Sequence, residues 1–150
     1  MKQNKIDLMI GLAKDTHQDD RYARKNYFDT HLEGVVSIVI YNFKPTYTRE
    51  FKDLLIIVGY GHDLLEDHPH LINYDLLLTW FGKEVADAIL AISKRPNELH
   101  SDYLDRVKSN ELARLVKIAD STFNMYNCII ENNFKKARYY ENNIKYLTDV

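Results

Sequence analysis

The sequence predicts an all-α protein, a bundle of about seven or eight helices in one domain over residues 1–150. The length of 150 residues suits a single domain with a sizeable core. Only 5 glycines and 3 prolines are present, so residues that break helices are scarce. Between these breakers, apolar residues recur at the three- and four-residue spacing of amphipathic helices.

The first half of the chain contains three expected helices. The first covers about residues 5–17, and a polar, basic connection follows at 19–26. Thr30 is expected as the N-cap of the second helix, because Glu33 three residues later completes a capping box. That helix is expected to stop before Pro45.

The third helix is expected to begin at Thr48 and to reach the pair His62-Asp63. Two stretches here, 35–40 and 54–58, are rich in β-branched residues and read locally as buried strands. We assign them to helices because each lies within a longer stretch without turn residues.

The second half is expected to contain four or five more helices. Asn73 is a candidate N-cap and Gly82 a candidate stop for the first of them. The remaining expected elements are helices at about 84–92, 101–108, 112–130 and 134–147, with a loop at 94–97.

Charge and composition narrow the function classes. The net charge of −2 argues against nucleic acid as the main partner. A single cysteine, Cys128, excludes an internal disulfide framework and suits a reducing compartment. No apolar run is long enough for a bilayer, and no signal peptide is visible. We therefore expect a cytoplasmic protein with no membrane partner.

The most informative feature is the string His62-Asp63-Leu64-Leu65-Glu66-Asp67. The pair His62-Asp63 offers one nitrogen and one oxygen ligand, and His31 and Asp120 could supply one more of each. Two nitrogens and two oxygens suit Mn²⁺ or Fe²⁺ better than Mg²⁺, which prefers oxygen. Taken singly, His31 and Asp120 could also be ordinary polar residues.

Glu66 and Asp67 lie one helical turn beyond Asp63. A carboxylate beside a metal centre can orient a water molecule or accept its proton. The alternative is that Glu66 and Asp67 form an ordinary solvated end of a helix, although carboxylates at a helix C-terminus interact unfavourably with the helix dipole.

The ordered set of motifs resembles an HD-domain phosphohydrolase, most closely the hydrolase domain of RelA/SpoT proteins and their small stand-alone relatives. The resemblance covers about residues 10–142. The segments that carry it are Ala13–Arg21, Phe28–His31, the HDxxED motif at His62–Asp67, Phe81–Ala86, Ser93–Arg95, and Ala113–Asp120 followed by Asn124.

The resemblance implies an HD-domain helical bundle and Mn²⁺-dependent release of the 3′-pyrophosphate from ppGpp by an activated water. It assigns His31, His62, Asp63 and Asp120 as metal ligands, and Glu66 and Asp67 as the residues that activate water. It further implies a small nucleotide substrate. The implied substrate contacts are Arg21, Lys94, Asn124 and, by a looser match, Arg138.

Other functions stay open at this stage. Ser121-Thr122-Phe123 departs from the family pattern after Asp120, which affects base recognition more than metal chemistry. The alternatives are an HD-domain nucleotidase or phosphodiesterase acting on another nucleotide, a non-catalytic nucleotide sensor, and a purely structural helical domain. The oligomeric state and the resident metal are left open.

Overall fold

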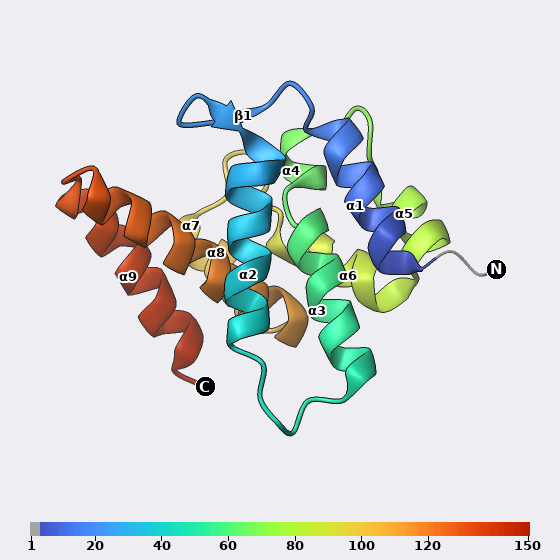
Figure 1. Ribbon diagram of the computed structural model, residues 1–150. Helices are drawn as coiled ribbons and strands as arrows, with labels where there is room; N and C mark the ends of the chain where they lie inside the picture. Colours follow the sequence, from blue (N-terminus) through green and yellow to red (C-terminus); the bar gives the residue numbers. More distant parts are fainter. Residues whose placement is uncertain (1–3) are drawn as a thin grey trace.

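A computed structural model describes residues 4–150 and confirms the all-α prediction (Figure 1). Eight helices of eight or more residues and the one-turn helix α4 make up most of this described range. They are α1 (Lys5–Thr16), α2 (Glu33–Tyr41), α3 (Arg49–Gly61), α4 (Leu64–Asp67), α5 (Tyr74–Phe81), α6 (Lys83–Ile92), α7 (His100–Lys108), α8 (Glu111–Ile130) and α9 (Phe134–Thr148).

Local capping explains where many of the helices begin. Thr48 accepts a hydrogen bond from the amide of Phe51 and begins α3, and Asn73 does the same for α5, as predicted. Gly82, at a φ of 92°, ends α5 and lets the chain turn directly into α6. The side chains of Asn4, Asn110 and Asn133 cap α1, α8 and α9 in the same way.

The prediction that Thr30 is an N-cap is wrong. Thr30 lies inside a π-helical turn (Phe28–Leu32) that continues directly into α2. The side chain of Asn26 accepts a hydrogen bond from the amide of Asp29 at 2.9 Å, so the cap lies four residues earlier than expected. Single π-helical turns of this kind occur frequently at functional sites.

The connection at 19–26 is also more ordered than expected, because it forms a small antiparallel hairpin. Strand β1 (Arg21–Tyr22) pairs with β2 (Lys25–Asn26). Ala23 and Arg24 make the turn between them, both with positive φ. Hairpin turns of this hand usually carry Asn and Gly, so the sequence contained no turn signal here.

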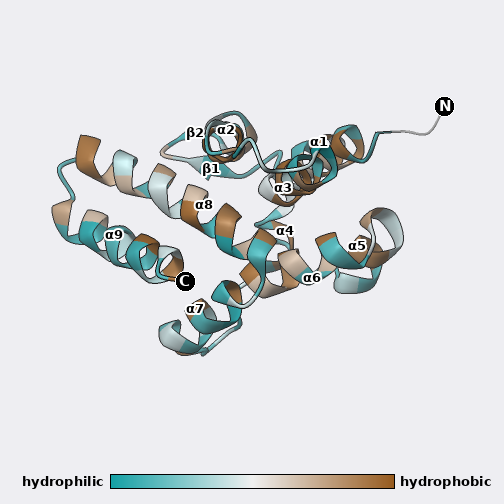
Figure 2. Ribbon diagram, turned by 90° about the horizontal axis from the view of Figure 1, so that it is seen from below, coloured by the Kyte–Doolittle hydropathy of each residue, from teal (hydrophilic) through white to brown (hydrophobic). Residues whose placement is uncertain are grey.

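The helices pack around a hydrophobic core to which α2, α3, α6 and α8 contribute fully buried side chains. Both β-branched stretches lie in helices, α2 and α3, as predicted. In Figure 2, hydrophobic and hydrophilic residues alternate along α8, as expected for an amphipathic helix. Among residues 4–150, no helix combines the length and apolar character needed to cross a membrane.

Close packing holds the end of α3 against its neighbours. A Cβ atom placed on Gly61 would lie 2.7 Å from Met9 of α1 and 2.9 Å from Ile89 of α6. The absence of a side chain at Gly61 lets the ends of Met9 and Ile89 pack this closely, and the next residue is His62. The packing of α1 and α6 therefore sets the position of the His62-Asp63 pair.

Candidate metal centre and active site

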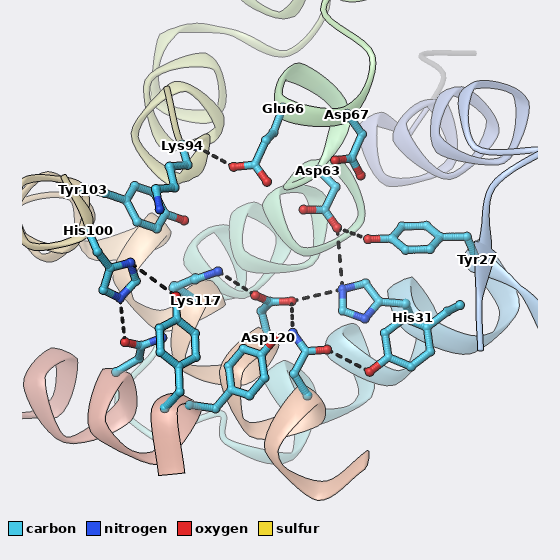
Figure 3. A pocket seen from close by; sticks show the side chains of 15 residues that line it. Tyr27, His31, Asp63, Glu66, Asp67, Lys94, His100, Tyr103, Lys117 and Asp120 are labelled. Carbon is cyan, nitrogen blue, oxygen red and sulfur yellow. Dashed lines mark hydrogen bonds and ion pairs between the residues drawn. The ribbon is translucent and has the colours of Figure 1, made fainter. Parts of the chain in front are cut away.

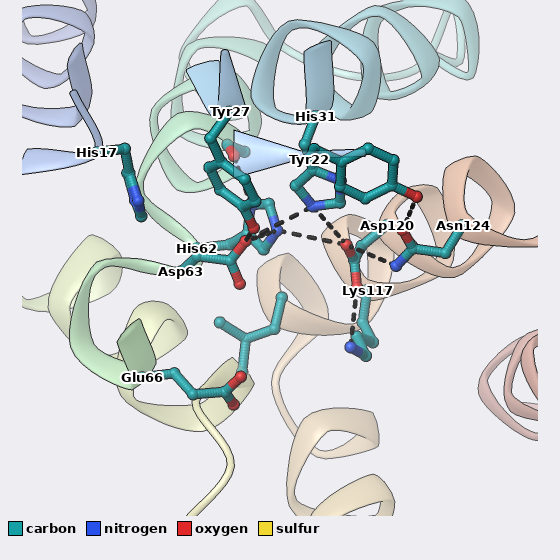
Figure 4. A network of polar contacts seen from close by, with 12 residues as sticks. His17, Tyr22, Tyr27, His31, His62, Asp63, Glu66, Lys117, Asp120 and Asn124 are labelled. Atoms are coloured by element: carbon teal, nitrogen blue, oxygen red, sulfur yellow. Dashed lines mark hydrogen bonds and ion pairs between the residues drawn. The ribbon is translucent and has the colours of Figure 1, made fainter. Parts of the chain in front are cut away.

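The four predicted metal ligands come together from separate segments of the chain (Figure 4). His31 projects from the π-helical turn, His62 and Asp63 link α3 to α4, and Asp120 lies in α8. Nε2 of His31 lies 3.0 Å from Oδ1 of Asp120 and 3.5 Å from Oδ2 of Asp63. Nε2 of His62 lies 3.1 Å from Oδ2 of Asp63 and 3.5 Å from Oδ1 of Asp120.

The hydrogen bonding of His62 shows that this set fits a cation. Its Nδ1 lies 2.7 Å from the carbonyl oxygen of Gly59, which can only accept, so whenever the imidazole is neutral its one ring proton is on Nδ1. Nε2 is then a bare lone pair, buried and without a hydrogen bond among the described residues. A lone pair and a carboxylate oxygen 3.1 Å apart repel each other unless a proton or a metal ion lies between them.

The pKa shifts of the four residues likewise indicate that a proton or a metal ion is needed between them. Burial opposes charge on each group, yet the neighbouring carboxylates raise the pKa of His31 and of His62. In return, the cationic partners lower the pKa of Asp63 and of Asp120 against the effect of burial. Two anionic oxygens and two imidazole nitrogens facing one point are the donor set of a divalent transition metal.

A partly buried lysine that the sequence analysis did not single out adds a positive charge. Lys117 lies one helical turn before Asp120 on α8, and its Nζ is 2.8 Å from Oδ2 of Asp120. Asp120 thus directs Oδ1 toward the histidines and Oδ2 toward Lys117. The spacing of three residues between Lys117 and Asp120 is visible in the sequence, but such pairs are common on helices.

Two tyrosines that the sequence analysis also missed hold the ligands in place. The hydroxyl of Tyr27 donates a hydrogen bond to Oδ2 of Asp63. The ring of Tyr22 stacks on His31 with centroids 5.1 Å apart, and its hydroxyl donates to Oδ1 of Asn124 at 3.0 Å. Tyr22 lies in strand β1 and Tyr27 directly follows strand β2, so both depend on a hairpin that the sequence did not reveal.

Glu66 and Asp67 lie on α4 beside the metal ligands (Figure 3). Desolvation, followed by the charges of Asp63 and Glu66, raises the pKa of Asp67 to about 7. Desolvation also raises the pKa of Glu66, whose Oε1 accepts a hydrogen bond from the backbone amide of Lys94 at 2.6 Å. A carboxyl group with a pKa near neutrality can both accept and donate a proton.

These groups line a cavity of about 380 Å³. Of the predicted substrate contacts, Lys94 and Asn124 line it. Asn124 lies one turn after Asp120, with Nδ2 3.4 Å from Oδ1 of that residue. The remaining wall is built of polar and aromatic side chains that the sequence analysis did not identify, namely His100, Tyr103, Tyr139, Tyr140 and Asn143.

The other two predicted contacts lie elsewhere. The guanidinium of Arg21 donates to the carbonyl oxygens of Gln18 and Asp20, and Arg21 lines a neighbouring cavity together with Glu66 and Asp67. Arg138 is exposed and does not line the 380 Å³ cavity, although the next two residues of α9 do. A helical residue turns by about 100° from its neighbour, so a one-residue difference in alignment changes which side chain faces the cavity.

No protein-family model matches the sequence. A search of curated proteins also finds no match. Among solved structures, a metazoan ortholog of SpoT that hydrolyses ppGpp and plays a role in starvation responses superposes with a TM-score of 0.72. The two chains are 16% identical, and the alignment covers 96% of this chain and 87% of the other. The chain therefore shares the fold of this SpoT ortholog.

Proposed function

We propose that the chain is a metal-dependent phosphohydrolase that removes the 3′-pyrophosphate of ppGpp or a closely related nucleotide. The observation that carries this proposal is the convergence of His31, His62, Asp63 and Asp120 at the edge of a cavity that also contains Glu66 and Asp67. A binding site alone needs the ligands but has no use for two adjacent carboxyl groups poised to move a proton.

The four ligands would hold Mn²⁺ or a similar divalent ion. A bound cation would supply Lewis acidity, neutralise phosphate charge and lower the pKa of a coordinated water. Asp67, with a pKa of about 7, would accept the proton of the attacking water. Glu66, held through the amide of Lys94, would orient that water.

The cavity wall is suited to a nucleotide. Lys94 and Lys117 provide positive charge for phosphate oxygens, and aromatic side chains such as Tyr103 and Tyr139 offer flat surfaces for a base or ribose. Asn124 presents an amide next to the candidate metal ligand Asp120. The similarity of the fold to that of a ppGpp hydrolase supports the choice of ppGpp as first substrate.

A second candidate function is the hydrolysis of a less highly charged nucleotide. Within residues 4–150, Lys94 and Lys117 are the only lysine or arginine side chains that line the 380 Å³ cavity, and Lys117 is already paired with Asp120. This is little positive charge for a tetraphosphate. The observation favours a nucleoside monophosphate or cyclic nucleotide as the alternative substrate class.

A product assay separates these possibilities. Purified protein with Mn²⁺ is incubated with ppGpp and with a panel of nucleotides, with Asp63→Ala as the inactive control. We expect GDP and pyrophosphate from ppGpp, lost in the variant. Orthophosphate from another nucleotide, without turnover of ppGpp, would support the second candidate. Binding of ppGpp without any turnover would identify a sensor and contradict both.

A further inference from the structure

A second group of potential metal ligands lies next to the centre described above. It consists of His17, Asp20 and His68, each of which offers one ligand atom within 4.8 Å of the other two. Nδ1 of His17 lies 2.7 Å from Oδ2 of Asp20, and Nε2 of His68 lies 2.6 Å from the same oxygen. None of the three belongs to the set His31, His62, Asp63 and Asp120.

We propose that His17, Asp20 and His68 form a second site for a divalent transition-metal ion such as Mn²⁺, Fe²⁺, Co²⁺ or Zn²⁺. Two imidazole nitrogens and one carboxylate oxygen are the donor set that these ions favour, whereas Mg²⁺ and Ca²⁺ require mainly oxygen. Three protein ligands leave coordination positions open for water or for a phosphate oxygen.

The backbone holds the three residues in place from two segments, the turn after α1 and the end of α4. His17 is the C-cap of α1, and the amide of Asp20 donates to its carbonyl oxygen at 2.9 Å. The amide of Tyr27 in turn donates to the carbonyl oxygen of Asp20 at 3.2 Å. His68 is the C-cap of α4, and its carbonyl oxygen accepts hydrogen bonds from Leu71 and Ile72. A local turn therefore brings His17 and Asp20 together, and the fold adds His68 from a segment 48 residues away from Asp20.

The burial of His17 is a second, independent observation. His17 is 0% exposed, and its Nε2 makes no hydrogen bond within residues 4–150. Burial lowers the pKa of His17 despite its hydrogen bond with Asp20, which favours the neutral ring, the form that binds a metal ion. Asp20 and His68 are 31% and 22% exposed, so the site opens toward solvent on their side.

The charge of the adjacent cavity suits a cation. This cavity of about 620 Å³ is lined by four acidic side chains, those of Asp19, Asp20, Glu66 and Asp67, against the single guanidinium of Arg21. A cleft lined by charges of one sign concentrates the opposite charge. Asp20 and His68, which would hold the cation, line this cavity together with Glu66 and Asp67.

Tyr27 joins the two groups of ligands. Its ring lies 5.0 Å from that of His17 and 5.0 Å from that of His31, and its hydroxyl donates to Asp63. In Figure 4 the ring of Tyr27 lies between His17 and the pair His62 and Asp63. The side chain of Tyr27 would thus separate the second site from the first, and Asp67 would be accessible to both.

The test counts cations bound to the full chain. Protein stripped with a chelator is dialysed against Co²⁺, and bound cobalt is measured by elemental analysis together with its d–d absorption. We expect two ions per chain in the unchanged protein and one in His68→Ala and in Asp20→Asn. Asp120→Ala is expected to lose the other ion, and His68→Ala combined with Asp120→Ala is expected to bind none.

The control is His70→Ala, which removes an exposed histidine two residues from His68 and should leave two ions bound. A thermal unfolding transition in each metal-free variant shows that the variant folds. If His68→Ala does not fold, Asp20→Asn is sufficient for the test. One ion in the unchanged protein, or two in both His68→Ala and Asp20→Asn, would overturn the proposal. The count needs no turnover, so its outcome is separate from that of the product assay.

Discussion

The hydroxyl of Tyr27 donates a hydrogen bond to Oδ2 of Asp63, the oxygen that also faces both histidines of the candidate metal centre. A carboxylate that accepts this hydrogen bond has its ligand oxygen held in one direction. Tyr27 comes from the segment before the π-helical turn and Asp63 from the end of α3, so the contact links two regions that are distant in sequence.

Tyr27→Phe should weaken metal binding and leave the fold intact. The ring still packs on His17 and His31, but Asp63 loses its donor, and loss of such an outer contact typically reduces metal affinity by about 10- to 100-fold. Titration with Mn²⁺ measures the change. Tyr60→Phe, which removes a hydrogen bond to Glu33 away from the site, is the matched control. Equal affinities in the two variants would contradict the role of Tyr27.

Asp67→Asn should abolish most turnover without emptying the metal centre. The change removes the carboxyl group that we expect to move the proton, and general base catalysis typically contributes about 10²- to 10⁴-fold. The rate constant kcat and the bound metal are measured on the same sample. Asp102→Asn, at an exposed position on α7, serves as a control. Retention of near-normal kcat in Asp67→Asn would exclude Asp67 as the base.

Gly34→Ala should disturb the metal centre through the core. A Cβ atom at Gly34 would overlap the ring of Phe123, which packs edge-on against His31. Overpacking of this kind costs about 1 to 3 kcal/mol of unfolding free energy. In Gly11→Ala, by contrast, the new Cβ meets nothing within 4 Å on helix α1, and a gain of about 0.5 to 1 kcal/mol is expected. Urea unfolding of both variants checks the opposite signs.

Glu98 should make stability depend on acid pH. Hydrogen bonds from Arg106 and from the amide of Arg95 lower the pKa of Glu98 from its ordinary 4.5. The folded state therefore gains stability above pH 4.5 that is lost as the pH falls through the lowered value. Because Arg106 also donates to the carbonyl oxygen of Ser93, the pair supports the loop that carries Lys94.

The measurement is the Tm of the unchanged protein and of Glu98→Gln from neutral pH to below pH 4.5. We expect the variant to melt at lower temperature near neutral pH and the difference to shrink on acidification. Glu131→Gln, at an exposed position, should show no such convergence. A difference in Tm between Glu98→Gln and the unchanged protein that stays constant with pH would contradict the assignment.

The helices were largely predictable because their determinants are local. Thr48, Asn73 and Gly82 act on amides or dihedral angles within a few residues, and amphipathic spacing marks the faces that become buried. The exception, Thr30, shows the limit of such reasoning. A capping box is only one of several ways to begin a helix, and here Asn26 and a π-helical turn begin it instead.

The sequence by itself determined the all-α class, most helix boundaries and the candidate ligands His31, His62, Asp63 and Asp120. Only the tertiary structure decided that Tyr22, Tyr27 and Lys117 surround them, that Arg138 does not line the cavity, and that His17, Asp20 and His68 meet. Helix formation depends on interactions between residues three or four apart. The meeting of side chains from distant segments depends on how whole helices pack, which no local pattern encodes.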